Sequence, residues 1–538
     1  MTNLKGYMGK VLFVDLTNKT HSEFPWTDED RKRTIGGKIM AADILLQHIR
    51  PGMKAFDEDN WLVISTGPLT RCKSPSSTRF NISTVSPLTG ILTSSNCGGP
   101  FGRRLKKAGW DAMVITGRAS ELTWIEIVDD EITFHDVPEF KGMLTGEVQK
   151  QFKGGITPLV IGPAGENKVL YAGVFSGERT AGRGGVGAVF GDKNLKVITA
   201  KGTQDPEIYD QERLDFLNEQ WKMQLLRHPI TGAQLSKLGT AGLVAPMQAH
   251  RILATKNFSR GRFDNFEKVS GEELAEKYLV GNGNCYSCPM RCERRVKLDG
   301  KNIKGPELET LGLLGPNIMN DDLEKIIRWN YELDELGMDT ISCAGSIAFA
   351  MELNEKGMWD SGLEFGKTDN LSEVFKDIAY RRGIGDILAD GTKRMSEKFG
   401  GDGVAFGVGM GVVELPVGDH GGQGGFGGVD VDLAAGLRHQ LLHRAHMVKV
   451  AVGQQDGLEL FALQGVQNGV RLIAGIDDHG LAVIGQDIGI GLIQSKSQLP
   501  NHLCLRSISS TVSRMRVTGP SLTDSTFMSA PKRPCWGS

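Results

Sequence analysis

The sequence predicts an α+β protein, in which a β-rich N-terminal domain is followed by mostly helical domains. Short runs of β-branched and aromatic residues, separated by glycine-rich loops, fill residues 1–204. Helical spacing with capping residues replaces this pattern over residues 205–400, and residues 401–538 form a Gly/His-rich region with only two glutamates. Because 538 residues exceed what one compact core holds, we expect three domains with these boundaries.

The strands expected in the first domain are short apolar or alternating runs between glycine- and proline-rich connections. They are Lys10–Asp15, Trp61–Ser65, Arg79–Val85, Ala112–Thr116, Trp124–Val128, Glu131–His135 and Pro158–Ile161. Asp129-Asp130 separates two alternating runs and predicts a hairpin turn. Helices are expected near Ile39–His48 and Phe101–Ala108.

Helix boundaries in the second domain follow from capping residues. Ser270 has capping-box spacing to Glu273 ahead of Leu274–Leu279. Asn320, followed by acidic residues, predicts the start of a helix that ends at Gly337, and Asp339 then caps the next one. The further helices expected here are Thr340–Leu353, Leu371–Arg381 and Gly385–Phe399.

Composition excludes several classes of function. The chain is 40% hydrophobic and 23% charged, and its net charge of -2 argues against a nucleic-acid-binding surface. No apolar run approaches the ~20 residues that cross a membrane, and the first residues lack the apolar core of a signal peptide. Eight cysteines, three of them clustered, favour a reducing cytoplasm over a disulfide framework.

The clustered cysteines are Cys285, Cys288 and Cys292, a C-x2-C-x3-C run. Three thiolates in one loop favour an iron–sulfur cluster with a fourth ligand from elsewhere. A structural zinc site stays open, although it usually has two C-x2-C halves. The radical-type cluster loop has the reverse order, C-x3-C-x2-C. The neighbouring Arg291, Arg294 and Arg295 could raise the cluster potential, dock an acidic electron carrier, or form a solvated basic face.

A glycine-rich run, Gly182 to Gly187, matches the dinucleotide pattern G-x-G-x-x-G. The match alone is weak, because the nearest acid, Asp205, lies in a polar linker rather than at a second strand end. Bare backbone amides beside Arg179 and Arg183 suit a phosphate or another oxyanion, and a tight turn in a sheet is the alternative.

Two further segments carry polar groups that suit a ligand. The stretch from Gly67 to Gly99 combines small polar side chains, bare glycines and Arg79, which allow close approach of a phosphorylated ligand; an ordinary Ser/Thr loop is the alternative. Asp334 and Asp339 flank the expected helix break at Gly337 and could accept paired N–H bonds from a pterin-like edge; otherwise Asp339 is only a helix cap and Asp334 is solvated.

Together these features resemble the tungsten-containing aldehyde ferredoxin oxidoreductase family. The resemblance runs from about Gly9 to Gly400 and is carried by the cysteine loop, the stretch from Asp334 to Thr340 and a series of motifs in order. These motifs are Ser65-Thr66-Gly67-Pro68-Leu69-Thr70, Arg79-Phe80-Asn81, Ser86-Pro87-Leu88-Thr89-Gly90, Asn96-Cys97-Gly98-Gly99, Lys107-Ala108-Gly109-Trp110-Asp111, Ile161-Gly162-Pro163-Ala164-Gly165-Glu166-Asn167 and Ala181-Gly182-Arg183-Gly184-Gly185-Val186-Gly187-Ala188-Val189.

The resemblance implies a β-structured base domain on which two pterins bind one tungsten or molybdenum. The residues it assigns to pterin are Arg79, Asn96, Gly98, Ala181, Gly182 and Arg183, with Asp334 and Asp339 from the helical side. It assigns a [4Fe–4S] cluster to Cys285, Cys288, Cys292 and a fourth cysteine, for which Cys504 is the candidate.

The implied reaction converts an aldehyde and water into a carboxylate, with electrons passing to ferredoxin. Glu309 matches a carboxylate near the metal and is the candidate general acid/base, and His439 falls at the position of the family's histidine.

Two departures from the family keep alternatives open. The Glu-x-x-His motif of its iron-bridged dimer is replaced by Arg328-Trp329-Asn330-Tyr331, so that dimer is not expected and the oligomeric state is not indicated. Beyond Gly400 little matches, which leaves open a Gly-rich last domain, a disturbed reading frame, or a defective family member without a complete site. A relative that acts on another substrate, such as an aromatic thioester, is a further alternative.

Overall fold

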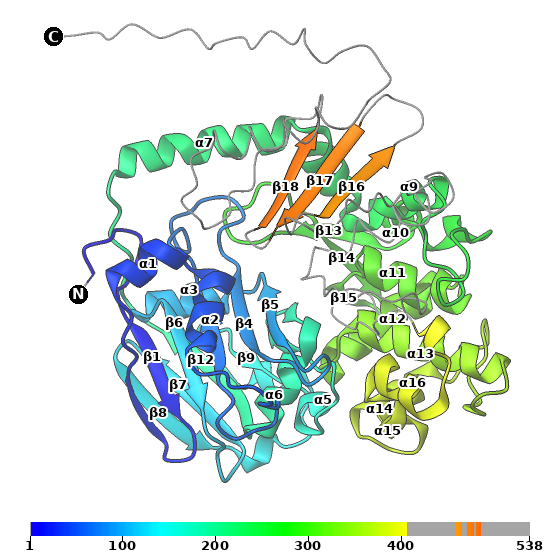
Figure 1. The fold of residues 1–538 in the computed structure, drawn as a ribbon, viewed down its shortest axis with the longest axis horizontal. Helices are drawn as coiled ribbons and strands as arrows, with labels where there is room; N and C mark the ends of the chain where they lie inside the picture. The colour runs from blue at the N-terminus through cyan, green and yellow to red at the C-terminus, as the bar shows by residue number, and fades with distance from the viewer. Residues whose placement is uncertain (1, 406–458, 465–470, 478–479, 486–538) are drawn as a thin grey trace, which may run out of the picture. The chain divides into compact units, whose positions relative to one another are not determined.

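The computed structural model describes residues 2–405 and the backbone of residues 459–464, 471–477 and 480–485. The chain divides into two compact units, Met1–Asp432 and Leu433–Ser538. Within the first unit, strands and short helices precede a mostly helical part, so the predicted α+β class is confirmed (Figure 1).

The first sheet has six strands in the order β2-β1-β6-β3-β4-β5. Only the β1–β6 pair is parallel, and the other neighbours are antiparallel. Every residue of β3 and β4 is buried, which accounts for their continuous apolar and small-residue sequences. The strands are β1 (Val11–Asp15), β2 (Thr20–Glu23), β3 (Leu62–Ser65), β4 (Phe80–Val85), β5 (Leu92–Cys97) and β6 (Ala112–Thr116).

The second sheet also has six strands, in the order β11-β10-β9-β12-β7-β8, with β12 and β7 parallel. Asp129, at φ 50°, forms with Asp130 the predicted turn of the β7–β8 hairpin. The strands are β7 (Thr123–Val128), β8 (Glu131–Asp136), β9 (Leu159–Val160), β10 (Val174–Ser176), β11 (Arg179–Ala181) and β12 (Leu195–Lys201).

Short helices accompany the two sheets. Helix α2 contacts β3 and β4, whereas α3 and α6 contact β12. The helices are α1 (Asp28–Thr34), α2 (Gly37–Leu46), α3 (Phe101–Lys107), α4 (Thr145–Lys150), α5 (Pro163–Glu166) and α6 (Val186–Asp192).

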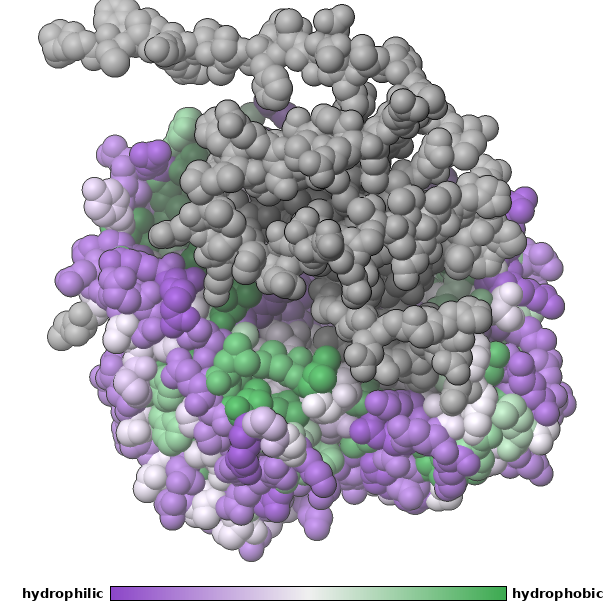
Figure 2. All heavy atoms as spheres, viewed as in Figure 1, coloured by the Kyte–Doolittle hydropathy of each residue, from purple (hydrophilic) through white to green (hydrophobic). Residues whose placement is uncertain are grey.

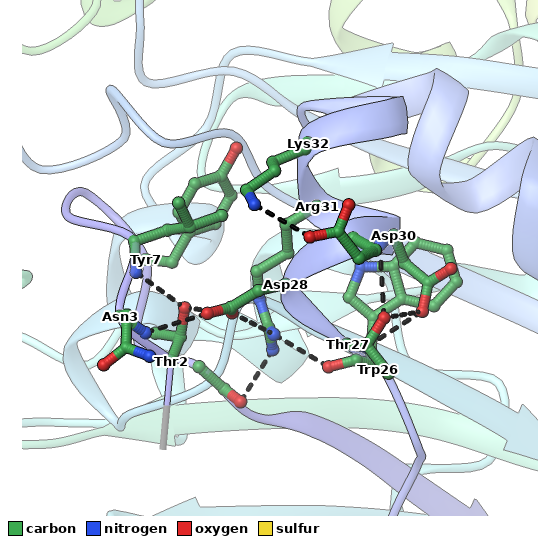
Figure 3. Close-up of polar contacts among 12 residues, drawn as sticks. Thr2, Asn3, Tyr7, Trp26, Thr27, Asp28, Asp30, Arg31 and Lys32 are labelled. Atoms are coloured by element: carbon green, nitrogen blue, oxygen red, sulfur yellow. Dashed lines mark hydrogen bonds and ion pairs between the residues drawn. The ribbon is translucent and has the colours of Figure 1, made fainter.

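Hydrogen bonds around α1 hold the first residues of the chain in place (Figure 3). The Asp28 carboxylate accepts from the Thr2 hydroxyl and, at 2.9 Å, from the backbone N–H of Asn3. The buried Arg31 guanidinium donates to the carbonyls of Trp26 and Gly9, each at 2.7 Å. These bonds fix α1 against the start of β1.

The helical part begins with α7 and includes one small sheet in the order β13-β14-β15. Its strands are β13 (Leu279–Gly283), β14 (Glu293–Leu298) and β15 (Lys301–Lys304). Its helices are α7 (Gln211–Arg227), α8 (Leu235–Leu238), α9 (Val244–Ala249), α10 (Gly271–Lys277), α11 (Leu308–Leu314), α12 (Leu323–Leu336), α13 (Thr340–Glu355), α14 (Leu371–Ala379), α15 (Ile384–Leu388) and α16 (Gly391–Phe399).

The largest hydrophobic core joins the helical part to the strand-rich part. The fully buried Tyr171, which comes from the connection before β10, lies in the same cluster as residues of α12 and α13. Its hydroxyl donates to the Leu388 carbonyl at 3.0 Å. The strand-rich and helical segments therefore pack as one folded body.

Two predicted helix boundaries in this part are wrong. The expected single helix over Gly385–Phe399 is divided into α15 and α16, because Gly391 adopts φ +80°. The cap of α12 is Asp322 rather than Asn320, and its carboxylate accepts from the Lys325 N–H at 3.1 Å. Asp321 and Asp322 both follow Asn320, and either of them can cap a helix, so the sequence did not fix the first residue of α12.

In the second unit the described strands β16 (Glu459–Gln464), β17 (Arg471–Asp477) and β18 (Gly480–Gly485) form an antiparallel sheet. The rest of the predicted third domain, including His439 and Cys504, lies outside the described residues. Among the described residues, no helix has the length and apolar character needed to span a bilayer.

The surface of the described chain is mixed. In the view of Figure 2, hydrophilic side chains alternate with hydrophobic ones. The exposed large apolar residues include Ile39 and Leu46 of α2, Ile91 of the β4–β5 turn, and Phe216 and Trp221 of α7.

Candidate functional site

The β4–β5 hairpin orients the first of the predicted pterin-binding residues. Arg79 directly precedes β4, and its Nε donates to Oδ1 of Asn96 on β5. Asn96 Nδ2 in turn donates to Oδ1 of Asn81 at 3.0 Å, across a pair of residues that face each other in the register. The contacts of Arg79 among the described residues are to the side chain and the carbonyl of Asn96 and not to a carboxylate, so its charge is available to an anionic ligand.

The second predicted group meets across the boundary between the strand-rich and helical parts. Arg183 follows β11, and its Nη1 lies 2.6 Å from Oδ2 of Asp339 and 3.1 Å from the Ser342 hydroxyl. Asp339 is also the predicted N-cap of α13, because it accepts from the backbone amides of Ile341 and Ser342. A Cβ added to Gly182 would lie 3.3 Å from Asp339 Oδ1. The structure thus brings the Ala181–Arg183 segment and Asp339 together.

Asp334 has a different cationic partner. Its Oδ2 lies 3.5 Å from Nζ of Lys304, at the end of β15, and both side chains are largely buried. Burial raises the pKa of Asp334, although Lys304 opposes the shift. For Lys304, burial lowers the pKa but the carboxylates of Asp334 and Glu307 outweigh it, so the lysine pKa is raised. Asp334 is therefore not the solvated carboxylate of the alternative interpretation.

The cysteine loop lies against the hairpin that carries Arg79. A Cβ added to Gly98 would lie 3.1 Å from the sulfur of Cys285 and 3.3 Å from Nη1 of Arg79. The sulfur of Cys288 is 3.7 Å from the hydroxyl of Ser76. Gly98 is therefore the place where the cysteine loop and the predicted pterin-binding residues meet.

The third cysteine is partly buried. Burial raises the pKa of Cys292, and the guanidinium of Arg179 opposes this shift. Within the described residues no three His, Cys, Asp or Glu side chains are arranged to hold a metal ion. The six described cysteines are free. In donor chemistry the loop suits an iron–sulfur cluster: three free thiols stand beside Arg79 and Arg179, which would offset the charge of thiolates.

Unpartnered polar groups support a polar ligand at the same hairpin. The hydroxyls of Ser74 and Thr78, in the loop that leads into Arg79, are buried and have no hydrogen-bond partner among the described residues. Buried hydroxyls are normally hydrogen-bonded, so two buried hydroxyls without a partner favour a polar molecule bound beside them. The side chains present fit a phosphorylated pterin in this respect.

The arginines near the cysteine loop do not form the solvated basic face that was one interpretation of the sequence. Arg294 is 3% exposed, and its guanidinium donates to four carbonyls, three of them from Leu235 to Lys237 in α8. Arg295 pairs with Glu178 and Glu293. Of the three, Arg291 remains exposed.

Arg179 is also used internally, because its guanidinium lies 2.5 Å from Glu293 and 3.7 Å from Glu307. Its pKa is raised by these carboxylates and the nearby cysteines, against burial, which lowers it. Arg179 therefore joins β11 to β14, directly after Cys292, rather than standing free for an oxyanion.

The glycine-rich run after β11 is a tight turn, which was the alternative interpretation of its sequence. A single turn over Arg183–Gly185 leads into α6, with Gly184 and Gly185 at φ 76° and 71°. A Cβ on Gly185 would lie 2.1 Å from the Leu170 carbonyl oxygen, so a side chain there would displace backbone. The run thus turns the chain and places Arg183 beside Asp339.

Glu309 lies in the first turn of α11, with its side chain exposed. His439 and Cys504 lie outside the described residues, so their positions relative to Glu309 and the cysteine loop stay predictions.

Comparisons with known proteins identify the family of the chain. Residues 11–202 match the model for the N-terminal domain of aldehyde ferredoxin oxidoreductase, and residues 217–449 match the model for its domains 2 and 3. A tungsten-containing aldehyde ferredoxin oxidoreductase of Pyrococcus abyssi (strain GE5 / Orsay) is 40% identical over 438 residues, which cover 78% of this chain and 72% of that protein. The chain belongs to the aldehyde ferredoxin oxidoreductase family.

Two further proteins that are similar to this chain have names that give other activities. An aliphatic sulfonate oxidoreductase, WOR-like subunit, of Pyrococcus furiosus is 31% identical over 433 residues, 73% of this chain and 67% of that protein. The solved active-site complex BamBC of benzoyl coenzyme A reductase, with 1,5-dienoyl-CoA, is 28% identical with a TM-score of 0.66. The match covers 74% of this chain and 64% of that one. The chain is therefore similar to proteins whose names give different substrates, and its likeness to the reductase complex includes the fold.

Sequence reasoning missed Lys304 and the unpartnered hydroxyls of Ser74 and Thr78. Lys304 carries no local signal, because its partner Asp334 is 30 residues further on. Ser74 and Thr78 were noted only as part of a polar stretch, and burial, which distinguishes them, is set by tertiary packing.

Proposed function

We propose that this member of the family oxidises an aldehyde to a carboxylate at a bispterin tungsten or molybdenum centre. Electrons would leave through a [4Fe–4S] cluster to ferredoxin. The observation that supports this most is the meeting of Cys285 with Gly98 and Arg79. A cluster on the cysteine loop and a pterin on the hairpin would be neighbours there, as electron transfer between them requires.

The residues proposed to hold the cofactors follow from these contacts. Arg79, Asn96 and Gly98 would bind one pterin through the hairpin, and Ala181, Gly182 and Arg183 through the turn after β11. Asp334 and Asp339 would accept N–H bonds from the helical side. Cys285, Cys288 and Cys292 would bind the cluster, with Cys504 as the fourth ligand.

The reaction balances as an aldehyde plus water giving a carboxylate, two electrons and three protons. The bound metal would accept the electron pair, and the cluster would pass the electrons on singly. Protons need an acceptor, for which Glu309 is the candidate because its carboxylate is exposed at the start of α11. His439 is the second candidate for proton transfer.

The test uses anaerobically purified protein. We expect tungsten or molybdenum by elemental analysis, an iron–sulfur signal in electron paramagnetic resonance, and aldehyde-dependent reduction of a viologen dye. Cys285→Ser should lose the cluster signal, and Cys504→Ser should do the same if Cys504 is the fourth ligand. The control Cys72→Ser, at a cysteine that donates to the Pro68 carbonyl, should retain it. Protein without tungsten, molybdenum or a cluster would contradict the proposal.

A second candidate keeps the cofactors and changes the substrate. The likeness to benzoyl coenzyme A reductase favours an aromatic thioester. Assays with aldehydes and with benzoyl-CoA, on the same metal-loaded preparation, distinguish the two. A third candidate, a defective family member, predicts normal folding of residues 2–405 with no activity on either.

A further inference from the structure

The cysteine loop has one aromatic side chain that faces basic residues rather than the interior. Tyr286, between Cys285 and Cys288, is 38% exposed. Its ring lies 4.1 Å from the guanidinium carbon of Arg103 on α3, a cation–π contact. The loop that would hold the cluster therefore reaches the surface at Tyr286, beside α3.

Positive charge gathers around this contact. Burial lowers the pKa of Arg103, and the neighbouring Arg104 and Arg71 lower it further, which places these three guanidinium groups within electrostatic range of one another. Lys73, two residues after Arg71, is exposed. We call Arg71, Lys73, Arg103, Arg104 and Tyr286 the α3 face.

Within the part of the chain that the structure describes, Arg71 alone among the basic residues of the α3 face forms an ion pair. Among the described residues, Arg103 and Lys73 form no ion pair, and Arg104 donates only to a carbonyl, that of Gly155. Arg71 pairs with Asp205, an exposed residue. By contrast, Arg294 and Arg295, which follow the cysteine loop in β14, are satisfied by carbonyls and carboxylates.

The α3 face also contacts the cysteine loop through a second path. Ser76, in the loop that carries Arg71 and Lys73, lies against the sulfur of Cys288 at 3.7 Å. A partner bound on this face would therefore sit close to two of the three cysteines. Short separation favours electron transfer, and complementary charge accelerates the encounter of protein partners.

We propose that the α3 face, which includes the contact of Tyr286 with Arg103, is the docking surface for an acidic electron-carrier protein of the ferredoxin type. The proposal rests on the proposed function for the identity of the redox centre. A cluster held by the cysteine loop would supply one electron at a time, and the oxidised carrier would accept that electron and become reduced. No proton or bond changes in this step.

The experiment measures binding of an oxidised, acidic two-cluster ferredoxin to the anaerobically purified, metal-loaded enzyme by biolayer interferometry. The Arg103→Gln variant lowers the net charge of the α3 face by one. The double variant Arg103→Gln/Lys73→Glu lowers it by three. We expect the double variant to weaken ferredoxin binding about tenfold and to reduce its dependence on salt. Lys393→Glu, at an exposed lysine of α16, is the control and should bind as the unchanged enzyme does.

Aldehyde-dependent viologen reduction and iron content are measured in parallel, and both should stay unchanged in all three variants. Equal weakening by Lys393→Glu, or no weakening by the double variant, would overturn the docking surface. If the protein reduces viologen but does not bind ferredoxin, the proposed ferredoxin-type partner is wrong, whereas the proposed aldehyde oxidation still stands. A protein that binds ferredoxin in a charge-dependent way without aldehyde activity would support the surface and contradict the proposed function.

Discussion

The guanidinium of Arg183 lies 2.6 Å from the carboxylate of Asp339, although 156 positions separate the two residues. The same carboxylate caps α13 through the backbone amides of Ile341 and Ser342. One side chain thus fixes both the start of a buried helix and the direction of an arginine in the turn after β11. Substitutions of Asp339 that keep or remove its oxygen and its charge can separate the helix cap from the ion pair with Arg183.

Asp339→Asn keeps an oxygen that caps α13 but removes the negative charge, whereas Asp339→Ala removes both. We expect Asp339→Ala to lower the free energy of unfolding by about 1 kcal/mol through the lost cap, and Asp339→Asn to lower it less. Both variants should lose bound tungsten or molybdenum, because Arg183 is no longer held. Thermal unfolding and elemental analysis measure the two effects, and equal melting temperatures would show that the cap contributes nothing.

Gly98 is the contact point between the cysteine loop and Arg79, so added volume there should disturb both. A Cβ would lie 3.1 Å from the Cys285 sulfur, which is tighter than ordinary van der Waals contact. We expect Gly98→Ala to reduce iron content and Gly98→Val to reduce it more strongly. Gly281→Ala, in β13, is the matched control because nothing lies within 4 Å of its Cβ position. Full iron content in Gly98→Val would contradict the close approach.

Lys304→Met should destabilise the protein in a pH-dependent way. It leaves the buried Asp334 carboxylate unpaired, a loss of about 3 kcal/mol for a buried pair. The pKa of Asp334 is already raised by burial and rises further without Lys304. In the unfolded chain Asp334 therefore loses its proton at a lower pH than in the folded variant. The free energy of unfolding then falls as pH rises above about 4, the ordinary pKa of an aspartate.

The measurement compares melting temperatures of the unchanged and Lys304→Met proteins at pH 5 and pH 8. The deficit of the variant should be larger at pH 8, where Asp334 is driven to ionise. In the double variant Lys304→Met/Asp334→Asn the pH dependence of this deficit should disappear. A deficit that is the same at both pH values would exclude the carboxylate as its cause.

Local signals predicted the helix ends near the site. The cap at Asp339 and the C-terminal glycine at Gly337, which adopts φ 89°, depend on residues within a few positions of each other. The break at Gly391 also depends on a local backbone angle, but a glycine inside a helical pattern does not itself show whether that angle is adopted.

Contacts between residues that lie far apart in the chain could not be predicted from the sequence. The sequence offered Arg294 the same roles as Arg291 and Arg295, which were tuning the cluster, docking a carrier or forming a solvated face. Its guanidinium instead binds carbonyls of α8 that lie 57 to 59 residues earlier in the chain. Nothing in the local sequence separates it from Arg291, which is exposed. The pairing of Cys285 with Gly98 was implied only by resemblance to a family, because spacing along one loop does not tell which strand the loop meets.

Glu309 gives the most direct test of the proposed chemistry. Glu309→Gln keeps the shape of the side chain and removes its capacity to accept a proton, so we expect kcat for aldehyde oxidation to fall about 100-fold or more. Iron and tungsten or molybdenum contents should not change, because no cofactor is assigned to this carboxylate. Glu397→Gln, at an exposed position of α16, is the matched control and should retain full activity. The acidic limb of the pH–rate profile should also flatten in Glu309→Gln, since that limb reports protonation of the base. A variant with normal kcat and an unchanged profile would remove Glu309 from the mechanism and leave His439 as the remaining candidate.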